Sequence, residues 1–245
     1  MELFYNNLSN NSGSIAEFDD FERQHIVRTY RKKISDIIFF TDGNGNLYQG
    51  EITEVKPKLK TNYSLIKSYE SPAKKSALGI GYIRPTRLDF IFEKGTELGI
   101  NIFFLFACEY SNYFTKNITR WVKITRQAIK QSNRYFLPEI IIFNNFSLYL
   151  DTVEKIKHKF LANHDATQFV YDTLQSLKLQ NGEDILFTIG PEGGFNKSEL
   201  TLAEKFGLNF VSFGENIVRT ETAAIAAASY MNLLNSDVKD ISTRD

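Results

Sequence analysis

Two glycine-containing stretches are the parts of this sequence best suited to chemistry, and each stands between an apolar run and a segment with helical spacing. The first is GPEGG, residues 190–194, which follows the apolar residues 185–189. Glycine lets the backbone adopt unusual angles and approach a ligand closely. Proline fixes its own φ and removes a donor. This combination predicts a rigid loop whose backbone is shaped to hold a ligand.

The 190–194 loop does not match the phosphate-binding loop of nucleoside triphosphatases. Such a loop needs a Lys-Ser or Lys-Thr pair after its last glycine, but Phe195 and Asn196 follow here. Residues 79–81 (GIG) lack the third glycine of a dinucleotide-binding fingerprint, because Arg84 stands in its place. We interpret residues 79–81 as a turn.

The second stretch is FGENIVRTETAAIAAA, residues 213–228, which follows another apolar run and leads into an alanine-rich helix. Arg219 and Glu221 in this stretch could pair with each other or cap the helix, and each alone is more typical of structure than of catalysis. In an open α/β sheet, ligands bind at the carboxyl ends of strands. Because both stretches follow strands, we expect them to meet at one sheet edge, where a catalytic interpretation of Arg219 and Glu221 gains weight.

Histidine and cysteine do not form a metal-ligand pattern. His25, His158 and His164 show no ligand spacing, and Cys108 is the one cysteine of the chain. Zinc sites need several such residues at short spacing. We therefore expect no metal site and no intrachain disulfide, and a single cysteine fits a reducing compartment.

The N-terminal part has the pattern of β structure. Residues 34–40 are β-branched and aromatic, the turn-forming residues 41–46 follow, and residues 47–52 alternate as the return strand. Residues 63–69 also alternate. Several short strands with polar turns are typical of a small barrel. Residues 71–76 are interpreted as the linker that follows it.

Beyond the linker, helical spacing alternates with continuous apolar runs, which indicates an α/β domain with a mainly parallel sheet. Gly99 and Gly207 are expected to end helices, and Asn196 with Glu199 predicts a capping box at the start of one. The predicted helices span residues 87–98, 118–133, 153–160, 166–179 and 197–206, and the predicted strands span residues 100–107, 139–143, 185–189 and 210–213.

Composition favours a globular protein with a local basic surface. The chain has 245 residues, of which 42% are hydrophobic, and a formal net charge of +0. Between Arg23 and Arg87, lysine and arginine outnumber aspartate and glutamate thirteen to five, so this region can bind phosphates although the total cancels. A solvated face of cations explains the same counts. No apolar run approaches the ~20 residues of a membrane span, and MELFYNNLSN lacks the features of a signal peptide, so we expect a cytoplasmic protein without a membrane partner.

Together, GPEGGF and GENIVRTETAAIAA resemble the SPOUT superfamily of knotted methyltransferases, and specifically its 16S rRNA (uracil-N3)-methyltransferase family. The similarity extends over nearly the whole chain, since EKGTELG (residues 93–99) fits the family's K-x-T-E-L-G signature and DGNG (residues 42–45) fits its N-terminal barrel. The family usually has glycine at Ser35, arginine at Tyr110 and leucine at Phe213. The family's R-W…Q-x-x-R…P helix is matched by Arg120, Trp121, Gln131, Arg134 and Pro138.

This resemblance implies a protein of two domains. Residues 1–70 would form a PUA-like β-barrel that binds RNA, and residues 71–245 a SPOUT α/β domain with a trefoil knot. It implies that the cofactor is S-adenosyl-L-methionine and that the reaction methylates N3 of a specific uridine in 16S ribosomal RNA of the small subunit. It also implies a homodimer in which the partner chain borders each active site, and no metal.

The resemblance further assigns roles to residues. Arg219, by its position on a cofactor loop, would stabilise negative charge on the uracil, and Glu221 would orient Arg219 or accept the proton. The cofactor would contact Ile189, Gly190, Pro191, Glu192, Gly193, Gly194, Phe213, Gly214, Ile217, Val218, Arg219, Thr222 and Ala223. The RNA would contact His25, Arg28, Arg31, Lys94, Arg120, Gln131 and Arg134.

Three cations, Arg126, Lys130 and Arg134, recur at every fourth position of the segment that begins near Ile118. Their spacing predicts a charged ridge, which is either a solvated outer face or a surface that contacts phosphates.

Two other interpretations stand beside the methyltransferase. A non-catalytic RNA-binding protein would keep the barrel and lose methyl transfer, which the departures at Ser35 and Tyr110 allow. The complete loops at residues 190–194 and 214–222 argue against it. A related knotted methyltransferase would act on ribose or on transfer RNA, but the T-E-L-G and R-T-E-T-A signatures favour the uracil-N3 family.

Overall fold

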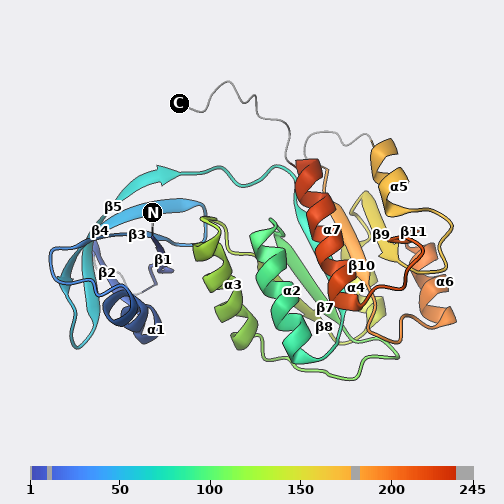
Figure 1. The fold of residues 1–245 in the computed structure, drawn as a ribbon, viewed down its shortest axis with the longest axis horizontal. Helices are drawn as coiled ribbons and strands as arrows, with labels where there is room; N and C mark the ends of the chain where they lie inside the picture. The colour runs from blue at the N-terminus through green and yellow to red at the C-terminus, as the bar shows by residue number, and fades with distance from the viewer. Residues whose placement is uncertain (1, 10–12, 178–182, 236–245) are drawn as a thin grey trace. The chain divides into compact units, whose positions relative to one another are not determined.

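The computed structural model describes three stretches of the chain, residues 2–9, 13–177 and 183–235. The chain forms two compact units (Figure 1), which are residues 1–71 with 126–137 and residues 72–125 with 138–245. The first boundary lies at the start of the predicted linker. Residues 126–137, however, belong to the smaller unit although they fall within the second predicted domain. Composition along the chain does not reveal that the chain comes back to the smaller unit at these residues.

The smaller unit is built on five strands, β1 (Leu3–Tyr5), β2 (Ile15–Phe18), β3 (Ile37–Thr41), β4 (Asn46–Glu54) and β5 (Leu59–Ser68). They form one sheet in the order β1-β3-β4-β5-β2, with β1 parallel to β3 and the other neighbours antiparallel. The β3–β4 hairpin turns at Asp42, whose Oδ1 accepts from the backbone N–H groups of Asn44 and Asn46 at 2.8 and 3.3 Å. The DGNG pattern predicted this turn.

Alternation along the strands gives this sheet a buried face. In β4, Ile52 is buried while its neighbours Glu51 and Thr53 are exposed. The buried face contributes to an aromatic-rich core cluster that includes Ile26. Ile26 comes from the π-helical turn η1 (His25–Thr29), which directly follows α1 (Asp20–Gln24).

A buried ion pair joins α1 to the last turns of α3 (Thr119–Gln131) within the smaller unit. Lys130 Nζ lies 2.5 Å from Glu22 Oε1, and both side chains are 3% exposed. Burial raises the pKa of Glu22, and the neighbouring Lys130 opposes that rise. Because a buried charge is tolerated only when it is paired, each of the two residues depends on the other.

Six strands form the sheet of the larger unit, namely β6 (Ser76–Gly81), β7 (Ile102–Phe106), β8 (Glu139–Phe143), β9 (His158–Ala162), β10 (Ile185–Ile189) and β11 (Asn209–Val211). Their order is β11-β9-β10-β6-β7-β8, and every neighbouring pair is parallel. The predicted α/β fold with a parallel sheet is thus confirmed. The carboxyl ends of all six strands lie along one edge, which is where ligands bind in open α/β sheets.

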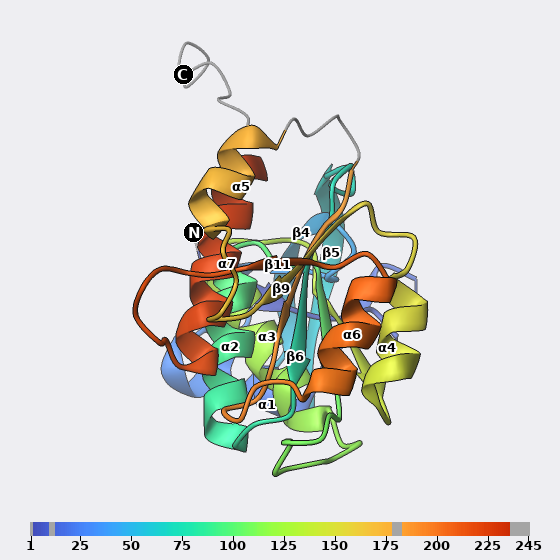
Figure 2. The ribbon, with the colours of Figure 1, turned by 90° about the vertical axis from the view of Figure 1, so that its right-hand side faces the viewer.

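Helices cover both faces of this sheet, so the larger unit has three layers (Figure 2). One face carries α2 (Pro85–Glu97), α5 (Val170–Ser176) and α7 (Thr220–Asn235), and the other carries α4 (Phe146–Val153) and α6 (Lys197–Lys205). Phe187 of β10 belongs to the first of these cores and Leu186 to the second, as expected for a strand buried on both faces. No helix in the described part of the chain is long and apolar enough to cross a membrane.

At two strands the structure differs from the secondary structure predicted from the sequence. Residues 76–81, interpreted as linker and turn, form β6, a central strand. A Cβ on Gly79 would lie 2.1 Å from the hydroxyl of Tyr149, so this glycine marks close packing of α4 on the strand rather than a turn. Residues 153–160, predicted as a helix, contain the end of α4 and the start of β9, because Lys159, Phe160 and Leu161 are buried in the sheet.

Replacing Lys130 with methionine tests the buried ion pair. We expect Lys130→Met to lower the free energy of unfolding by about 3–5 kcal/mol, because Glu22 is left as a buried charge. Without Lys130 the pKa of Glu22 rises further, and a carboxyl with a raised folded-state pKa contributes stability at low pH that is lost as pH rises through that pKa. Urea unfolding at about pH 5 and about pH 7 should therefore show the larger loss at the higher pH.

The matched control removes both charges. Lys130→Met combined with Glu22→Leu should cost much less than Lys130→Met alone, since no buried charge is left unpaired. Equal losses in the single and double variants, or a loss that does not change with pH, would contradict this account of the pair.

Candidate active site

Three loops meet at the carboxyl ends of β9, β10 and β11, which are neighbours in the sheet of the larger unit. The loops are residues 163–169, 190–196 and 212–219. The last two contain the stretches that the sequence analysis singled out. The expectation that both would end on one sheet edge is therefore confirmed.

The loop after β10 turns tightly. The backbone N–H of Gly194 donates to the carbonyl of Pro191 at 2.8 Å, and Gly194 has a φ of +71°. This angle lies in the left-handed region, which residues with a Cβ rarely adopt. The loop's first two residues are buried and its next two are exposed, so the chain leaves the core within the turn.

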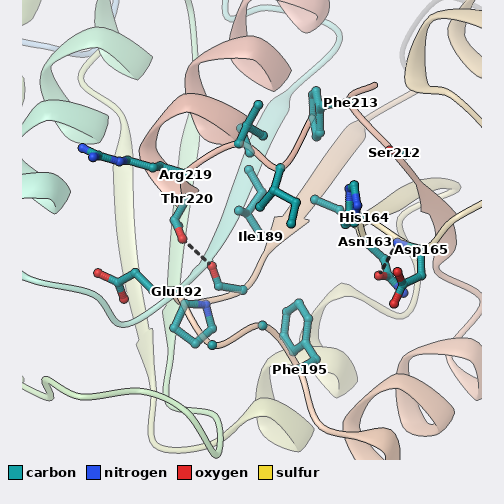
Figure 3. Close-up of a pocket in the computed structure, with 18 of the residues that line it drawn as sticks. Asn163, His164, Asp165, Ile189, Glu192, Phe195, Ser212, Phe213, Arg219 and Thr220 are labelled. Atoms are coloured by element: carbon teal, nitrogen blue, oxygen red, sulfur yellow. Dashed lines mark hydrogen bonds between the residues drawn. The ribbon is translucent and has the colours of Figure 1, made fainter. Parts of the chain in front are cut away.

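Hydrogen bonds join the three loops. The hydroxyl of Thr220, the first residue of α7, donates to the carbonyl of Gly190 at 3.1 Å (Figure 3). Thr220 is only 6% exposed, so this bond is shielded from water. The backbone N–H of Ser212 donates to the carbonyl of Gln168 at 2.8 Å. The loops therefore form one connected wall.

These loops border a cavity of about 500 Å³, a volume typical of small-molecule sites. Of the residues assigned to the cofactor from the sequence, all but Gly214 and Thr222 line it. Those that do are Ile189, Gly190, Pro191, Glu192, Gly193, Gly194, Phe213, Ile217, Val218, Arg219 and Ala223.

One wall of the cavity was missed by the sequence analysis. Asn163, His164 and Asp165 line it from the carboxyl end of β9, and Figure 3 shows His164 and Asp165 on the side opposite Arg219. The backbone N–H of Asp165 donates to Asn163 Oδ1 at 3.1 Å, which shapes this turn. The available signal was a run of polar residues directly after an apolar segment, but residues 153–160 had been predicted as a helix.

A guanidinium links the two glycine-containing stretches. Nη1 of Arg87, in the first turn of α2, donates to Glu192 Oε1 at 2.9 Å and lies 3.6 Å from Glu221 Oε2. Glu221 Oε2 is buried and has no hydrogen bond in the described part of the chain, so the ion pair with Arg87 balances its charge. Arg87 was not among the residues predicted from the sequence. Its position just after β6, at the same edge of the sheet, was the usable signal.

The two predicted catalytic residues flank the start of α7 but do not pair with each other. Arg219 is exposed, and its side chain extends to the same side of the cavity as Glu192 (Figure 3). Among the described residues, the ion pair of Glu221 is with Arg87. The structure thus gives Glu221 a different partner from the one that the sequence suggested.

The predicted capping box starts α6. The backbone N–H of Glu199 donates to Asn196 Oδ1 at 2.8 Å, and that of Asn196 donates to Glu199 Oε2 at 2.9 Å. The other oxygen, Glu199 Oε1, accepts from the backbone N–H of Glu109 at 2.8 Å. One carboxylate therefore also ties the loop after β7 to the start of α6.

Of the residues assigned to RNA in the smaller unit, three lie in and just after η1. Arg28 and Arg31 are exposed. His25 is half-buried against the rings of Phe4 and Tyr30, and burial lowers its pKa. The arginines are therefore open to phosphate groups, whereas His25 takes part in packing.

The charged ridge expected from sequence is not a solvated face. Lys130 is buried against Glu22, and the guanidinium of Arg126 lies over the ring of Tyr5, 4.6 Å from its centroid. Arg134 is half-buried, and burial lowers its pKa to about 10. Arg126 and Lys130 share a face of α3 that packs within the smaller unit, whereas Arg134 lies beyond the end of that helix at Gln131.

Lys94 and Arg120, which were assigned to RNA in the larger unit, have carboxylate partners. Lys94 Nζ lies 2.9 Å from Glu97 Oε1 in its own helix, and Arg120 forms a bidentate pair with Asp89. An RNA phosphate would have to compete with these carboxylates. Gln131, at the end of α3, is exposed.

The described residues contain no group of histidine, cysteine, aspartate and glutamate side chains that could hold a metal ion. Cys108 is half-buried, and burial raises the pKa of its thiol to about 11. The thiol is therefore protonated at neutral pH, and since the thiolate is the reactive form, Cys108 is a poor nucleophile.

Known proteins resemble this chain over most of its length. Two curated relatives are called ribosomal RNA small subunit methyltransferase E. The protein from Buchnera aphidicola subsp. Acyrthosiphon pisum is 25% identical over 229 residues, covering 90% of this chain and 88% of its own. The protein from Bacillus subtilis is 29% identical over 235 residues, covering 88% of this chain and 90% of its own.

A solved structure agrees with the fold. The ribosomal RNA small subunit methyltransferase E from Neisseria gonorrhoeae, bound to S-adenosyl methionine, matches with a TM-score of 0.80 and 25% identity, and covers 96% of this chain and 98% of its own. A family model described as an RNA methyltransferase domain matches residues 70–232, which is more than half of the chain. On that match, the protein belongs to the RNA methyltransferase family.

Proposed function

We propose that this protein transfers a methyl group from S-adenosylmethionine to N3 of a uridine in the 16S ribosomal RNA of the small subunit. The names of the relatives support the RNA substrate, and the cofactor-bound structure from Neisseria gonorrhoeae supports the cofactor. The choice of uridine N3 rests on the sequence resemblance. The observation that carries the proposal is the cavity between the 190–196 and 212–219 loops of an RNA methyltransferase domain.

The residues around the cavity fit S-adenosylmethionine. Phe213 and Ile217 offer an apolar surface suited to an adenine ring, and the glycine-containing residues 190–194 offer backbone donors and acceptors without side chains in the way. Asp165 and Arg219 bring charges of both signs, which suits a ligand that carries an ammonium, a carboxylate and a sulfonium group. No metal is needed to hold such a ligand.

When bound, S-adenosylmethionine supplies an electrophilic methyl carbon attached to a sulfonium. Uracil N3 holds a proton near neutral pH, so that proton must leave as the bond from N3 to the methyl carbon forms and the bond from that carbon to the sulfur breaks, which releases the sulfur as a neutral thioether. We assign stabilisation of the uracil's negative charge to Arg219, whose exposed guanidinium borders the cavity. We assign the role of proton acceptor to Glu221, whose Oε2 lies 3.6 Å from Arg87 Nη1 at the start of α7.

The proposal also includes the knot, the RNA-binding barrel and the homodimer that the sequence resemblance implies. The larger unit forms a SPOUT domain in which the 190–194 and 214–219 loops are part of a trefoil knot. The smaller unit forms a PUA-like barrel that binds RNA, a role supported by its five-stranded sheet and its exposed arginines. The protein acts in the cytoplasm as a homodimer, and the 81% exposure of Ile217 beside the cavity supports a neighbouring chain there.

Methyl transfer to small ribosomal subunits from cells that lack this protein tests the proposal. After incubation with labelled S-adenosylmethionine, nucleoside analysis should find the label in 3-methyluridine. A label on ribose, or transfer to transfer RNA alone, would overturn the proposed substrate. Cofactor binding without transfer to any RNA would overturn the enzyme and favour a non-catalytic RNA-binding protein.

Arg219 can be tested through turnover. Arg219→Ala should lower kcat about a hundred- to a thousand-fold, because a donor aimed at developing negative charge is lost. Arg219→Lys should recover part of the rate. Single-turnover assays with saturating cofactor measure both, and Lys155→Ala, which removes an exposed cation remote from the cavity, is the control. Near-normal turnover by Arg219→Ala with intact cofactor binding would rule out this role.

Arg87 can be tested through the two carboxylates that it holds. Arg87→Met should lower the free energy of unfolding by about 1–3 kcal/mol, because Glu221 Oε2 is left buried without a partner. Adding Glu221→Gln should restore much of that stability, while turnover stays low if Glu221 accepts the proton. Thermal unfolding and methyl transfer by the single and double variants decide this. Wild-type turnover by the double variant would exclude Glu221 as the base.

Arg28 and Arg31 can be tested through salt dependence. If both contact phosphates, Arg28→Gln with Arg31→Gln should reduce the slope of log affinity against log salt concentration by about two. Binding of the small-subunit RNA should be titrated at several potassium chloride concentrations. The same substitution at Lys33, which is also exposed in the smaller unit, shows the effect of general charge loss. An unchanged slope in the double variant would exclude phosphate contact by these arginines.

A further inference from the structure

The loop between β7 and α3, residues 107–118, carries three exposed aromatic side chains. Tyr110, Tyr113 and Phe114 are 46%, 43% and 50% exposed. Burial of a large aromatic ring contributes much free energy to packing and binding. Three exposed rings within five residues therefore suggest a surface that a ligand covers. None of the three lines the cavity, and none was assigned to the cofactor or to the RNA from the sequence, where Tyr110 was noted only as a departure from the family's usual arginine.

Tyr110 stands directly against the cavity wall. A Cβ built on Gly193 would lie 2.8 Å from the Cβ of Tyr110, so the tyrosine packs on that loop only because residue 193 is glycine. Gly193 itself lines the cavity. The exposed ring of Tyr110 is therefore next to the place where the cofactor is proposed to bind.

The aromatic loop is held at both ends. Near its start, the backbone N–H of Glu109 donates to the carboxylate of Glu199 at 2.8 Å. Towards its end, the buried Tyr82 donates its hydroxyl proton to the carbonyl of Thr115 at 2.7 Å, and its ring meets that of Phe114 at 5.2 Å. Rings on a loop that is fixed in advance lose little freedom when a ligand covers them.

Exposed cations lie on loops at the same edge of the sheet as these rings. β7 is the neighbour of β6 and β6 is the neighbour of β10, so the loops that follow these parallel strands leave the sheet together. Arg84 after β6 and Lys116 in the aromatic loop are both exposed. Neither forms an ion pair with another described residue, so both are available to phosphate groups.

Exposed rings beside cations are the combination with which proteins bind single-stranded nucleic acid. The proposed reaction also demands an unpaired base, because uracil N3 lies on the Watson–Crick edge and is blocked in a duplex. An unpaired base has lost its stacking neighbours, which an aromatic side chain replaces. RNA therefore fits this surface better than an apolar protein partner does.

We propose that the aromatic loop is a stacking platform for unpaired RNA bases. Tyr110 stacks on the methylated nucleotide or its immediate neighbour, and Tyr113 and Phe114 receive the bases beyond it. Arg84 and Lys116 contact the connecting phosphates. This inference rests on the proposed function, which supplies the RNA substrate and the unpaired nucleotide that is methylated.

Substitutions at Tyr110 separate stacking from packing. Tyr110→Leu keeps an apolar contact with Gly193 but removes the aromatic face, whereas Tyr110→Phe keeps the face and removes only the hydroxyl. We expect Tyr110→Leu to weaken binding of a fluorescein-labelled, uridine-rich single strand about tenfold or more. Tyr110→Phe should stay within a factor of about two of the wild type. Tyr171→Leu, at another exposed tyrosine that does not line the cavity, is the matched control.

Two further readouts decide what a loss of binding means. Cofactor affinity by titration calorimetry should be unchanged in Tyr110→Leu, since a collapse of the Gly193 wall would lower it. The KM for small ribosomal subunits should rise in parallel with the loss of strand affinity. A wild-type protein that binds the single strand no better than the same sequence in a duplex would overturn the platform. So would a Tyr110→Leu variant that changes only the oligomeric state.

The test distinguishes this inference from the proposed function. If the wild type methylates ribosomal subunits and Tyr110→Leu matches it in KM and strand affinity, the platform fails and the enzyme stands. If the wild type methylates no ribosomal RNA but loses strand affinity on Tyr110→Leu, the platform stands and the proposed reaction fails.

Discussion

Parallel pairing of β10 with β6 on one side and β9 on the other determines where the functional loops of the larger unit lie. Two parallel strands are joined by a crossover that brings the chain back to the end of the sheet where the strands begin. The loops that follow the strands therefore all lie at the end of the sheet where the strands finish. β10 is buried on both faces, which fixes its register because a slip by one residue would exchange its two sets of apolar side chains. The cavity, the pairing of Arg87 and the aromatic loop all depend on that arrangement.

Two kinds of contact then fix the glycine-containing stretches in place. The neutral hydrogen bond from Thr220 to Gly190 joins their backbones where water is excluded. The charged contacts of Arg87 join the side chains of Glu192 and Glu221 nearer the surface. Glycine supplies the backbone angles of these loops but no rigidity, so neighbouring groups must provide it. Loops fixed in this way lose less freedom when a ligand binds, which favours both affinity and catalysis.

The sequence predicts the features that are local and misses those that are not. The DGNG turn and the Asn196–Glu199 capping box depend on residues within a few positions, and both were found. β6 was missed because Gly79 looks like a turn residue until Tyr149 is packed on it. Arg87 was missed because its carboxylate partners lie over a hundred positions away in the chain, as the 105-residue separation from Glu192 shows. The burial of Lys130 escaped detection for the same reason, since spacing identifies a helix face but not what covers it.

In the proposed recognition of RNA, the exposed cations and the exposed aromatic rings contribute in different ways. Phosphate contacts hold RNA without regard to sequence, whereas contacts to bases choose the nucleotide. The exposed Arg28 and Arg31 of the smaller unit suit the first task. Tyr110 suits the second, because it lies against Gly193 and can select only a base that has left its stack. On these proposed roles, loss of the arginines would weaken binding to all RNA, whereas loss of the ring would weaken the preference for unpaired nucleotides over paired ones.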